Sequence, residues 1–287
     1  MEENITVRID GGIGRNIAAT VMLRNLKKEN PNSNINIVCS HPSIFKFNPN
    51  IKKAYPLNNA FLWDDVIKGT EYLTPEPYTN YNYYEKGEHI SKVFCDEIKV
   101  GCDSKKPDLF FTEKEIQGAN KFLMDQKKEV VLFQPFGQTN QTDEMYRDLT
   151  FEFAQKMVNA LLKEGYAVIQ ISAEDQQPLK GATKLKVGLR PLMALISNCK
   201  AVIGVDSFLQ HASNSFGKNT IVFWGGTDEG RVGYKEHTNI RAVKIKEHFP
   251  IRMEHNVPDG FHSNQGVNGK FDDEHINKVL KVIKDGR

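Results

Sequence analysis

The sequence predicts an α/β protein made of two Rossmann-like halves. Short apolar runs rich in β-branched residues are each followed by apolar residues at helical spacing. This alternation is interrupted and then restarts near residue 126, so the same unit is built twice. With 287 residues, the chain is also long enough for two domains that each bury a core. We therefore expect an N-terminal domain over residues 1–126 and a C-terminal domain over residues 127–287.

The first half opens with a βαβ unit. Residues 5–9 predict a strand, the glycines of residues 11–14 a tight loop, residues 17–26 a helix and residues 35–39 a second strand. Residues 58–87 are rich in Tyr, Asn and Pro without a clean period, so we expect irregular structure there.

The second half continues the alternation up to the end of the chain. A last helix over residues 272–284 has one apolar face and is expected to pack back across the domains. Strands are predicted at residues 130–133, 167–171, 202–205 and 221–224, and helices at residues 151–162, 191–196 and 208–216.

Composition narrows the functional class. Lys plus Arg total 38 and Asp plus Glu total 36, so the chain lacks the basic excess of a dedicated duplex-binding protein, although a local basic face stays open. The four cysteines show no C-x-x-C spacing, which is typical of free thiols in a reducing compartment. With no apolar leader and no run of membrane-spanning length, we expect a soluble protein of the bacterial or phage-infected host cytoplasm.

The most informative segment runs from Gly204 to Ala212. A buried strand ends there and a helix begins, which places Asp206 and Ser207 at the turn and His211 about one helical turn further on. In open α/β sheets this edge binds ligands, so the three side chains predict a nucleotide or phosphate site. The alternative is that Asp206 and Ser207 only cap the helix.

The first glycine loop does not match a dinucleotide site. Gly12 and Gly14 supply two glycines of G-x-G-x-x-G, but Ile17 occupies the third place, which argues against a nicotinamide or flavin oxidoreductase. The loop can still bring backbone amides close to an anion or a sugar, with Arg15 at the start of the next helix. The alternative is a tight turn without a ligand.

The sequence lacks the motifs of several other common enzyme classes. It contains no G-x-x-x-x-G-K-[ST] phosphate loop, no G-x-S-x-G nucleophile elbow and no Asp-x-Asp pair for a divalent metal. His248, His255 and His262 lie in a Pro- and Gly-containing stretch without neighbouring cysteines, so we expect no metal site. The polar residues present fit a metal-free phosphate site.

Four motifs stand out in the second half, at residues 134–139, 147–150, 205–211 and 223–227. Together they resemble glycosyltransferase family 9, the heptosyltransferase-like enzymes of GT-B fold, and the chain also resembles phage-encoded relatives. The first half is similar more faintly, through the loop from Gly11 to Gly14 and through residues 48–51.

The resemblance implies two domains that face each other across a cleft. It further implies a nucleotide-diphosphate-sugar co-substrate held by the second domain, an acceptor held by the first, inversion at the sugar carbon, and neither metal nor separate cofactor. In this comparison Arg147 is the cation for the leaving diphosphate, and Glu174 holds the ribose. The remaining donor-side positions are Gly137, Gln138, Thr139, Asp206, Ser207, His211, Gly225, Gly226 and Thr227; those of the acceptor-side loop are Gly11, Gly12, Gly14 and Arg15.

Two positions depart from the family pattern. Phe208 replaces a small Gly after Asp206 and Ser207, and Arg15 replaces the acid that is often assigned as general base. Asp10 is the nearest replacement for that base, although an Asp there also fits a residue that only braces the glycine turn.

Three functions stay open. The first is a glycosyltransferase acting on a glycan or lipopolysaccharide precursor. The second is a phage enzyme that adds a sugar to hydroxymethylated cytosine in DNA, and the third is a sugar-nucleotide binding module without catalysis. The oligomeric state is not predicted by the sequence.

Overall fold

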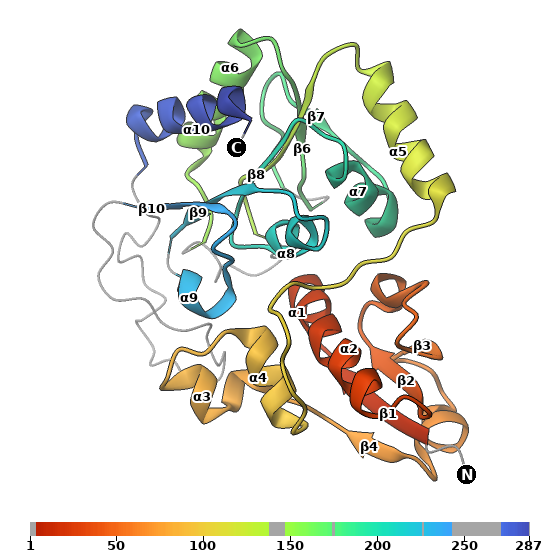
Figure 1. Cartoon of the computed structure of the whole chain (residues 1–287). Helices are drawn as coiled ribbons and strands as arrows, with labels where there is room; N and C mark the ends of the chain where they lie inside the picture. The colour runs from red at the N-terminus through yellow and green to blue at the C-terminus, as the bar shows by residue number, and fades with distance from the viewer. Residues whose placement is uncertain (1–3, 138–146, 174–175, 226, 243–270, 287) are drawn as a thin grey trace. The chain divides into compact units, whose positions relative to one another are not determined.

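The computed structural model divides the chain into two compact units, drawn in Figure 1. The first unit comprises residues 1–112 with residues 230–232, and the second comprises residues 113–229 with residues 233–287. The described residues are 4–137, 147–173, 176–225, 227–242 and 271–286.

The first unit contains a four-stranded parallel sheet in the order β3-β2-β1-β4. The side chains of β1 are largely buried, as expected for a parallel strand with both faces covered. The strands are β1 (Asn4–Ile9), β2 (Asn34–Cys39), β3 (Lys53–Pro56) and β4 (Glu71–Leu73). The helices are α1 (Ile13–Ala18), α2 (Thr20–Glu29), α3 (Tyr81–Tyr84) and α4 (Ile90–Glu97), with single turns at η1 (Pro42–Phe45), η2 (Trp63–Ile67) and η3 (Pro77–Thr79).

The second unit contains a six-stranded parallel sheet in the order β10-β9-β8-β5-β6-β7. Its strands are β5 (Val130–Gln134), β6 (Ala167–Gln170), β7 (Thr183–Lys184), β8 (Ala201–Val205), β9 (Thr220–Trp224) and β10 (Thr238–Arg241). Its helices are α5 (Glu113–Asp125), α6 (Phe151–Lys163), α7 (Leu189–Ile196), α8 (Phe208–Ser215) and α10 (Asp273–Asp285); α9 (Glu229–Val232) contributes to both units.

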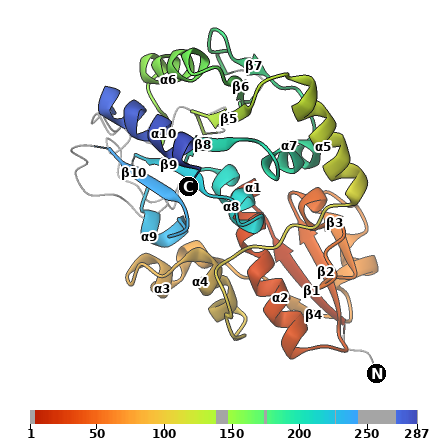
Figure 2. The same cartoon turned by 45° about the horizontal axis from the view of Figure 1, so that its top comes forward.

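Helices cover both faces of the second sheet. Figure 2 shows α6 and α10 on one face and α5, α7 and α8 on the other. The apolar side chains of α6 and α10 share one core with alternate residues of β5, β8 and β9. Every side chain of β5, β8 and β9 is buried, which is why these runs carry almost no polar residue.

A buried ion pair explains why α5 belongs to the second unit. Arg190 at the start of α7 is 7% exposed and forms a bidentate pair with Glu115 of α5, with Nε–Oε1 at 2.6 Å and Nη2–Oε2 at 2.8 Å. The division between the units therefore lies at residues 112–113, before α5, whereas the sequence placed it after this helix at residues 126–127.

Two local expectations need correction. Gly14 lies inside α1, which begins at Ile13, so only Gly11 and Gly12 form the loop. The segment over residues 58–87 contains β4, which pairs with β1, together with short helical turns. The final helix, α10, packs on α6 of its own unit, and Lys284 pairs there with Glu164 at 2.7 Å.

Polar side chains of α8 are buried in a hydrogen-bonded network. The Nδ1 atom of His211 lies 2.8 Å from the Tyr234 hydroxyl, and the Nε2 atom of His237 lies 3.0 Å from the Gln210 carbonyl oxygen. Burial lowers the pKa of His211 to about 4, and the negative charge of Asp206 opposes this shift only in part. His211 is therefore a neutral imidazole at pH 7.

We expect the free energy of unfolding to fall as the pH drops from about 6.5 towards about 4, because the unfolded chain then binds a proton at residue 211 that the folded chain does not. At pH about 4.5 the loss from this residue is about 2 to 3 kcal/mol, at about 1.36 kcal/mol per pH unit. His211→Gln keeps a hydrogen-bonding group towards Tyr234 and should lose this part of the pH dependence. Urea unfolding of wild type and variant at pH about 6.5 and about 4.5 measures the change in the free energy of unfolding. An equal decrease in both proteins would contradict the prediction.

Candidate functional site

The strand order of the second sheet reverses between β5 and β8. From β5 the chain adds β6 and β7 on one side, and then returns to place β8 on the other. Such a reversal leaves a crevice beyond the carboxyl ends of the two central strands, where open α/β sheets bind ligands. Gly137 follows β5, and Asp206 and Ser207 follow β8 directly. These three predicted donor residues therefore follow the two central strands at the reversal point.

Asp206 and Arg147 form the charged pair of the site. The Asp206 side chain is 5% exposed, and its Oδ1 atom accepts a 2.6 Å hydrogen bond from Nε2 of Gln210. Its Oδ2 atom lies 3.8 Å from Nη1 of Arg147, which also lies 3.4 Å from the backbone oxygen of Asp206. The Arg147 side chain remains 19% exposed, so a buried carboxylate orients a cation that solvent can reach.

Helix capping does not explain the two residues after β8. Ser207 is the N-cap of α8, but its side chain makes no capping hydrogen bond. Its hydroxyl instead donates to Oε1 of Gln134 at 2.7 Å and so links the carboxyl ends of β8 and β5. His211 lies one turn further along α8 and is bound to Tyr234, which gives it a structural partner.

The other predicted donor residues divide into two groups. Gly137 is buried, and its amide donates to Oδ1 of Asp148 at 2.5 Å while its carbonyl oxygen accepts from Gln176, a residue that the sequence did not single out. Gly225 and Thr227 are buried after β9. Gln138, Thr139, Glu174 and Gly226 lie outside the described residues.

The acceptor-side loop of the first unit is closed by its own hydrogen bonds. Gly11 has a φ of +81°, a backbone conformation that favours glycine, and Asn16 donates its side-chain amide to the carbonyl oxygens of Gly11 and Gly12 at 3.2 and 2.9 Å. Arg15 extends from the first turn of α1 to Glu76, with Nη2–Oε2 at 2.7 Å, and lies 3.5 Å from Oδ1 of Asp10. Sequence reasoning missed Glu76, because it lies in the segment expected to be irregular.

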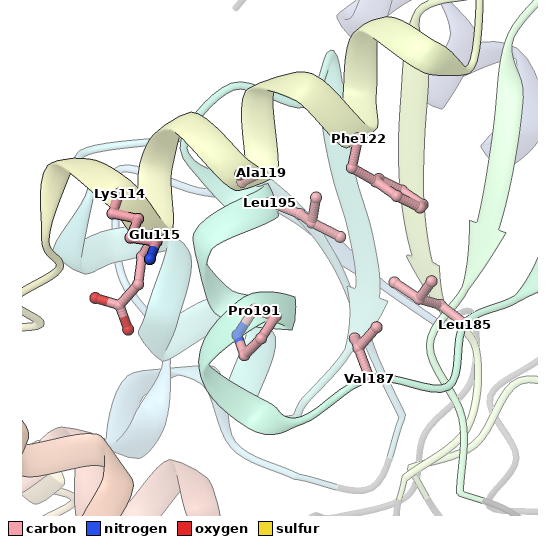
Figure 3. Close-up of a pocket in the computed structure, with 9 residues that line it drawn as sticks. Lys114, Glu115, Ala119, Phe122, Leu185, Val187, Pro191 and Leu195 are labelled. Carbon is pink, nitrogen blue, oxygen red and sulfur yellow. The ribbon is translucent and has the colours of Figure 1, made fainter.

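An apolar hollow of about 250 Å³ lies between α5 and α7 (Figure 3). Phe122, Leu185, Val187 and Leu195 line it, with the Glu115 side chain at one end. No predicted donor residue that the structure describes lines this hollow, and its apolar wall does not suit a diphosphate.

The described residues contain no group of three His, Cys, Asp or Glu side chains that could hold a metal ion. The same residues contain no helix that is long and apolar enough to cross a membrane. All four cysteines are free thiols, as the sequence predicted.

A family model matches part of the second unit. Residues 155–255 match the model of glycosyltransferase family 9 (heptosyltransferase), and this range includes Asp206, Ser207 and His211. A search of curated protein sequences gives no match.

Solved structures share the fold at low sequence identity. The glycosyltransferase family 9 structure from Veillonella parvula DSM 2008 has a TM-score of 0.73 at 16% identity, covering 99% of this chain and 98% of that chain. E. coli ADP-heptose lps heptosyltransferase II has a TM-score of 0.69 at 11% identity, covering 99% of both chains. The dodecameric iron-containing heptosyltransferase TibC from enterotoxigenic E. coli, in complex with ADP-D-β-D-heptose, has a TM-score of 0.67 at 11% identity, covering 99% of this chain and 76% of that chain.

The sequence motifs, the family match and the fold agree. Residues 155–255 are similar to glycosyltransferase family 9 (heptosyltransferase), and the chain has the parallel α/β fold of heptosyltransferase structures.

Proposed function

We propose that this protein transfers a sugar from a nucleotide-diphosphate-sugar to a hydroxyl group of a glycan or lipopolysaccharide precursor. Transfer inverts the sugar carbon and uses neither a metal nor a separate cofactor. The observation that carries the proposal is Arg147, a solvent-accessible guanidinium held beside Asp206 where the strand order of the second sheet reverses. We place the reaction in the cytoplasm of a bacterium or of a phage-infected host.

The second unit supplies the donor site in this proposal. The guanidinium of Arg147 binds the diphosphate and stabilises the charge that develops as it leaves, the task that a metal ion performs in other sugar transferases. Ser207 and Asp206 fix the ends of the central strands around it. ADP is the first nucleotide to test, because a similar solved structure holds ADP-D-β-D-heptose. Following the family motif, Gly137, Gln138, Thr139, Glu174, Gly225, Gly226 and Thr227 complete the site.

The first unit supplies the acceptor site. An inverting transfer needs a general base that takes the proton of the attacking hydroxyl. The family's acid is replaced by Arg15, and Asp10 remains a candidate from the sequence, beside Arg15 at the end of β1. Both carboxylates near Arg15 lie at the carboxyl edge of the first sheet, where an acceptor hydroxyl would bind.

Arg147→Ala should weaken binding of the preferred nucleoside diphosphate by about 1.5 to 3 kcal/mol, the contribution of hydrogen bonds to a charged group. Titration calorimetry with ADP, UDP and GDP measures the change. Lys200→Ala is the matched control, since Lys200 precedes β8 at the opposite edge of the same sheet and pairs with Glu129 at 3.1 Å. Equal affinity of wild type and Arg147→Ala would remove Arg147 from the donor site.

Salt dependence distinguishes a glycan acceptor from DNA. Transfer to a lipopolysaccharide-derived oligosaccharide should change little with salt, because few charges are neutralised when a sugar binds. Transfer to hydroxymethylcytosine DNA would fall steeply, with a log–log slope of roughly −0.9 for each phosphate contacted. Turnover assays over about 50 to 200 mM salt make the comparison. If transfer depends steeply on salt and the sugar is found on the DNA, the DNA alternative replaces the glycan proposal.

A further inference from the structure

The strand order of the first sheet also reverses, between β1 and β4. From β1 the chain adds β2 and β3 on one side, and then places β4 on the other side of β1. Asp10 directly follows β1, and Glu76 lies three residues after β4. Because β1 and β4 are parallel neighbours, both carboxylates lie at the same edge of the sheet, at its reversal point.

Arg15 is held in place by these carboxylates and by two aromatic rings. Its side chain is 9% exposed, and its Nη2 atom contacts Oε2 of Glu76 at 2.7 Å and the backbone oxygen of Pro75 at 3.4 Å. The guanidinium carbon lies 5.1 Å from the centre of the Tyr78 ring and 5.9 Å from that of Phe94. Because the Arg15 guanidinium is buried, ion-paired and stacked on aromatic rings, it orients the carboxylates beside it. It does not suit a phosphate ligand.

The two carboxylates differ in how their oxygens are engaged. Asp10 has a guanidinium at each oxygen, Arg15 at 3.5 Å from Oδ1 and Arg8 at 3.2 Å from Oδ2. Among the residues that the structure describes, Glu76 contacts Arg15 through Oε2, and its Oε1 atom has one long contact of 3.4 Å, with the backbone amide of Tyr78. The Glu76 side chain is 42% exposed, so Oε1 can accept a hydrogen bond from a ligand hydroxyl.

The backbone of Glu76 is fixed as well. Its amide donates to Oε2 of Glu97 at 3.4 Å, and its carbonyl oxygen accepts from the Thr79 hydroxyl at 3.1 Å. Glu76 is also the N-cap of η3, through the contact of Oε1 with Tyr78. The backbone contacts, the capping contact and the ion pair together orient the Glu76 side chain. A group that takes a proton from a substrate hydroxyl needs such a fixed orientation.

We propose that Glu76 is the general base of the transfer and that Arg15 is its positioning residue; this rests on the proposed function. The proton of the acceptor hydroxyl moves to Oε1 of Glu76 as the hydroxyl oxygen forms a bond to the sugar carbon. The bond from that carbon to the diphosphate oxygen breaks, and the nucleoside diphosphate leaves with the electron pair. The ion pair with Arg15 through Oε2 orients the Glu76 carboxylate for this step.

The test compares Glu76→Gln with Asp10→Asn in the whole 287-residue chain. The substrates are the nucleotide sugar and the oligosaccharide that wild type turns over in a panel beginning with ADP-heptose. Glu76→Gln should lower kcat by about 10²- to 10⁴-fold with the donor KM nearly unchanged. Asp10→Asn should lower kcat much less than Glu76→Gln does, because Asp10 contacts Arg15 but takes no proton in this proposal. Glu71→Gln is the matched control, an exposed carboxylate on β4 without a role in the proposal.

Two further variants separate catalysis from folding. Glu76→Asp keeps a carboxylate and should recover part of the rate lost in Glu76→Gln, whereas a purely structural role predicts no such recovery. Arg15→Lys should lower kcat with the donor KM nearly unchanged, because an ammonium group does not reproduce the planar guanidinium that contacts Glu76 and lies over the Tyr78 ring. Urea unfolding of each variant checks that the fold is retained.

The outcomes distinguish the two proposals. If wild type and Glu76→Gln turn over the substrates but Asp10→Asn does not, Glu76 is not the general base. The proposed function is then unaffected. The same holds if Glu76→Asp is as slow as Glu76→Gln while both unfold like wild type. No turnover by wild type with any donor in the panel would overturn the proposed function, and the role of Glu76 with it.

Discussion

Parallel strands that are buried on both faces are the constraint on which this structure depends. The central strands of the second sheet have no exposed side chain, so polar chemistry is excluded from the sheet itself. It can be placed only where the strands end, and most effectively where the strand order reverses. Each unit has one such reversal, between β5 and β8 and between β1 and β4. Asp206 and Ser207 lie at the reversal of the second unit. Asp10 and Glu76 lie at that of the first unit, with Arg15 between them.

Each of the two reversal points carries an ion pair between an arginine and a carboxylate, but the more buried partner differs. In the second unit the carboxylate of Asp206 is buried and the guanidinium of Arg147 is more exposed, at 5% against 19%. In the first unit Arg15 is the more buried partner, at 9% against 42% for Glu76. The second unit therefore presents a cation to solvent and the first presents a carboxylate. A diphosphate leaving group and an attacking hydroxyl need these two groups, which supports the division of tasks that we propose.

Arg15 stands where glycosyltransferase family 9, which this chain resembles, has an acid. Read along the sequence, this position loses a carboxylate and leaves Asp10 as the nearest substitute. In the folded unit, the arginine binds a carboxylate from a segment 61 residues away. Sequence reasoning missed Glu76 because β4 is only three residues long and mostly exposed, so it lacks the buried apolar run that identifies the other strands. Similarly, the boundary before α5 depends on the pairing of Glu115 with Arg190, 75 residues apart.

The sequence by itself determined the alternation of strands and helices and the position of Asp206 at a strand-to-helix turn. These features depend on local periodicity, which is visible in a window of about 11 to 18 residues. Only the tertiary structure decided that Ser207 joins Gln134, that His211 is a buried neutral partner of Tyr234, and that Arg15 holds Glu76. Each of these contacts depends on which strands become neighbours in the sheet. Strand order arises from long-range packing, and local sequence patterns do not encode it.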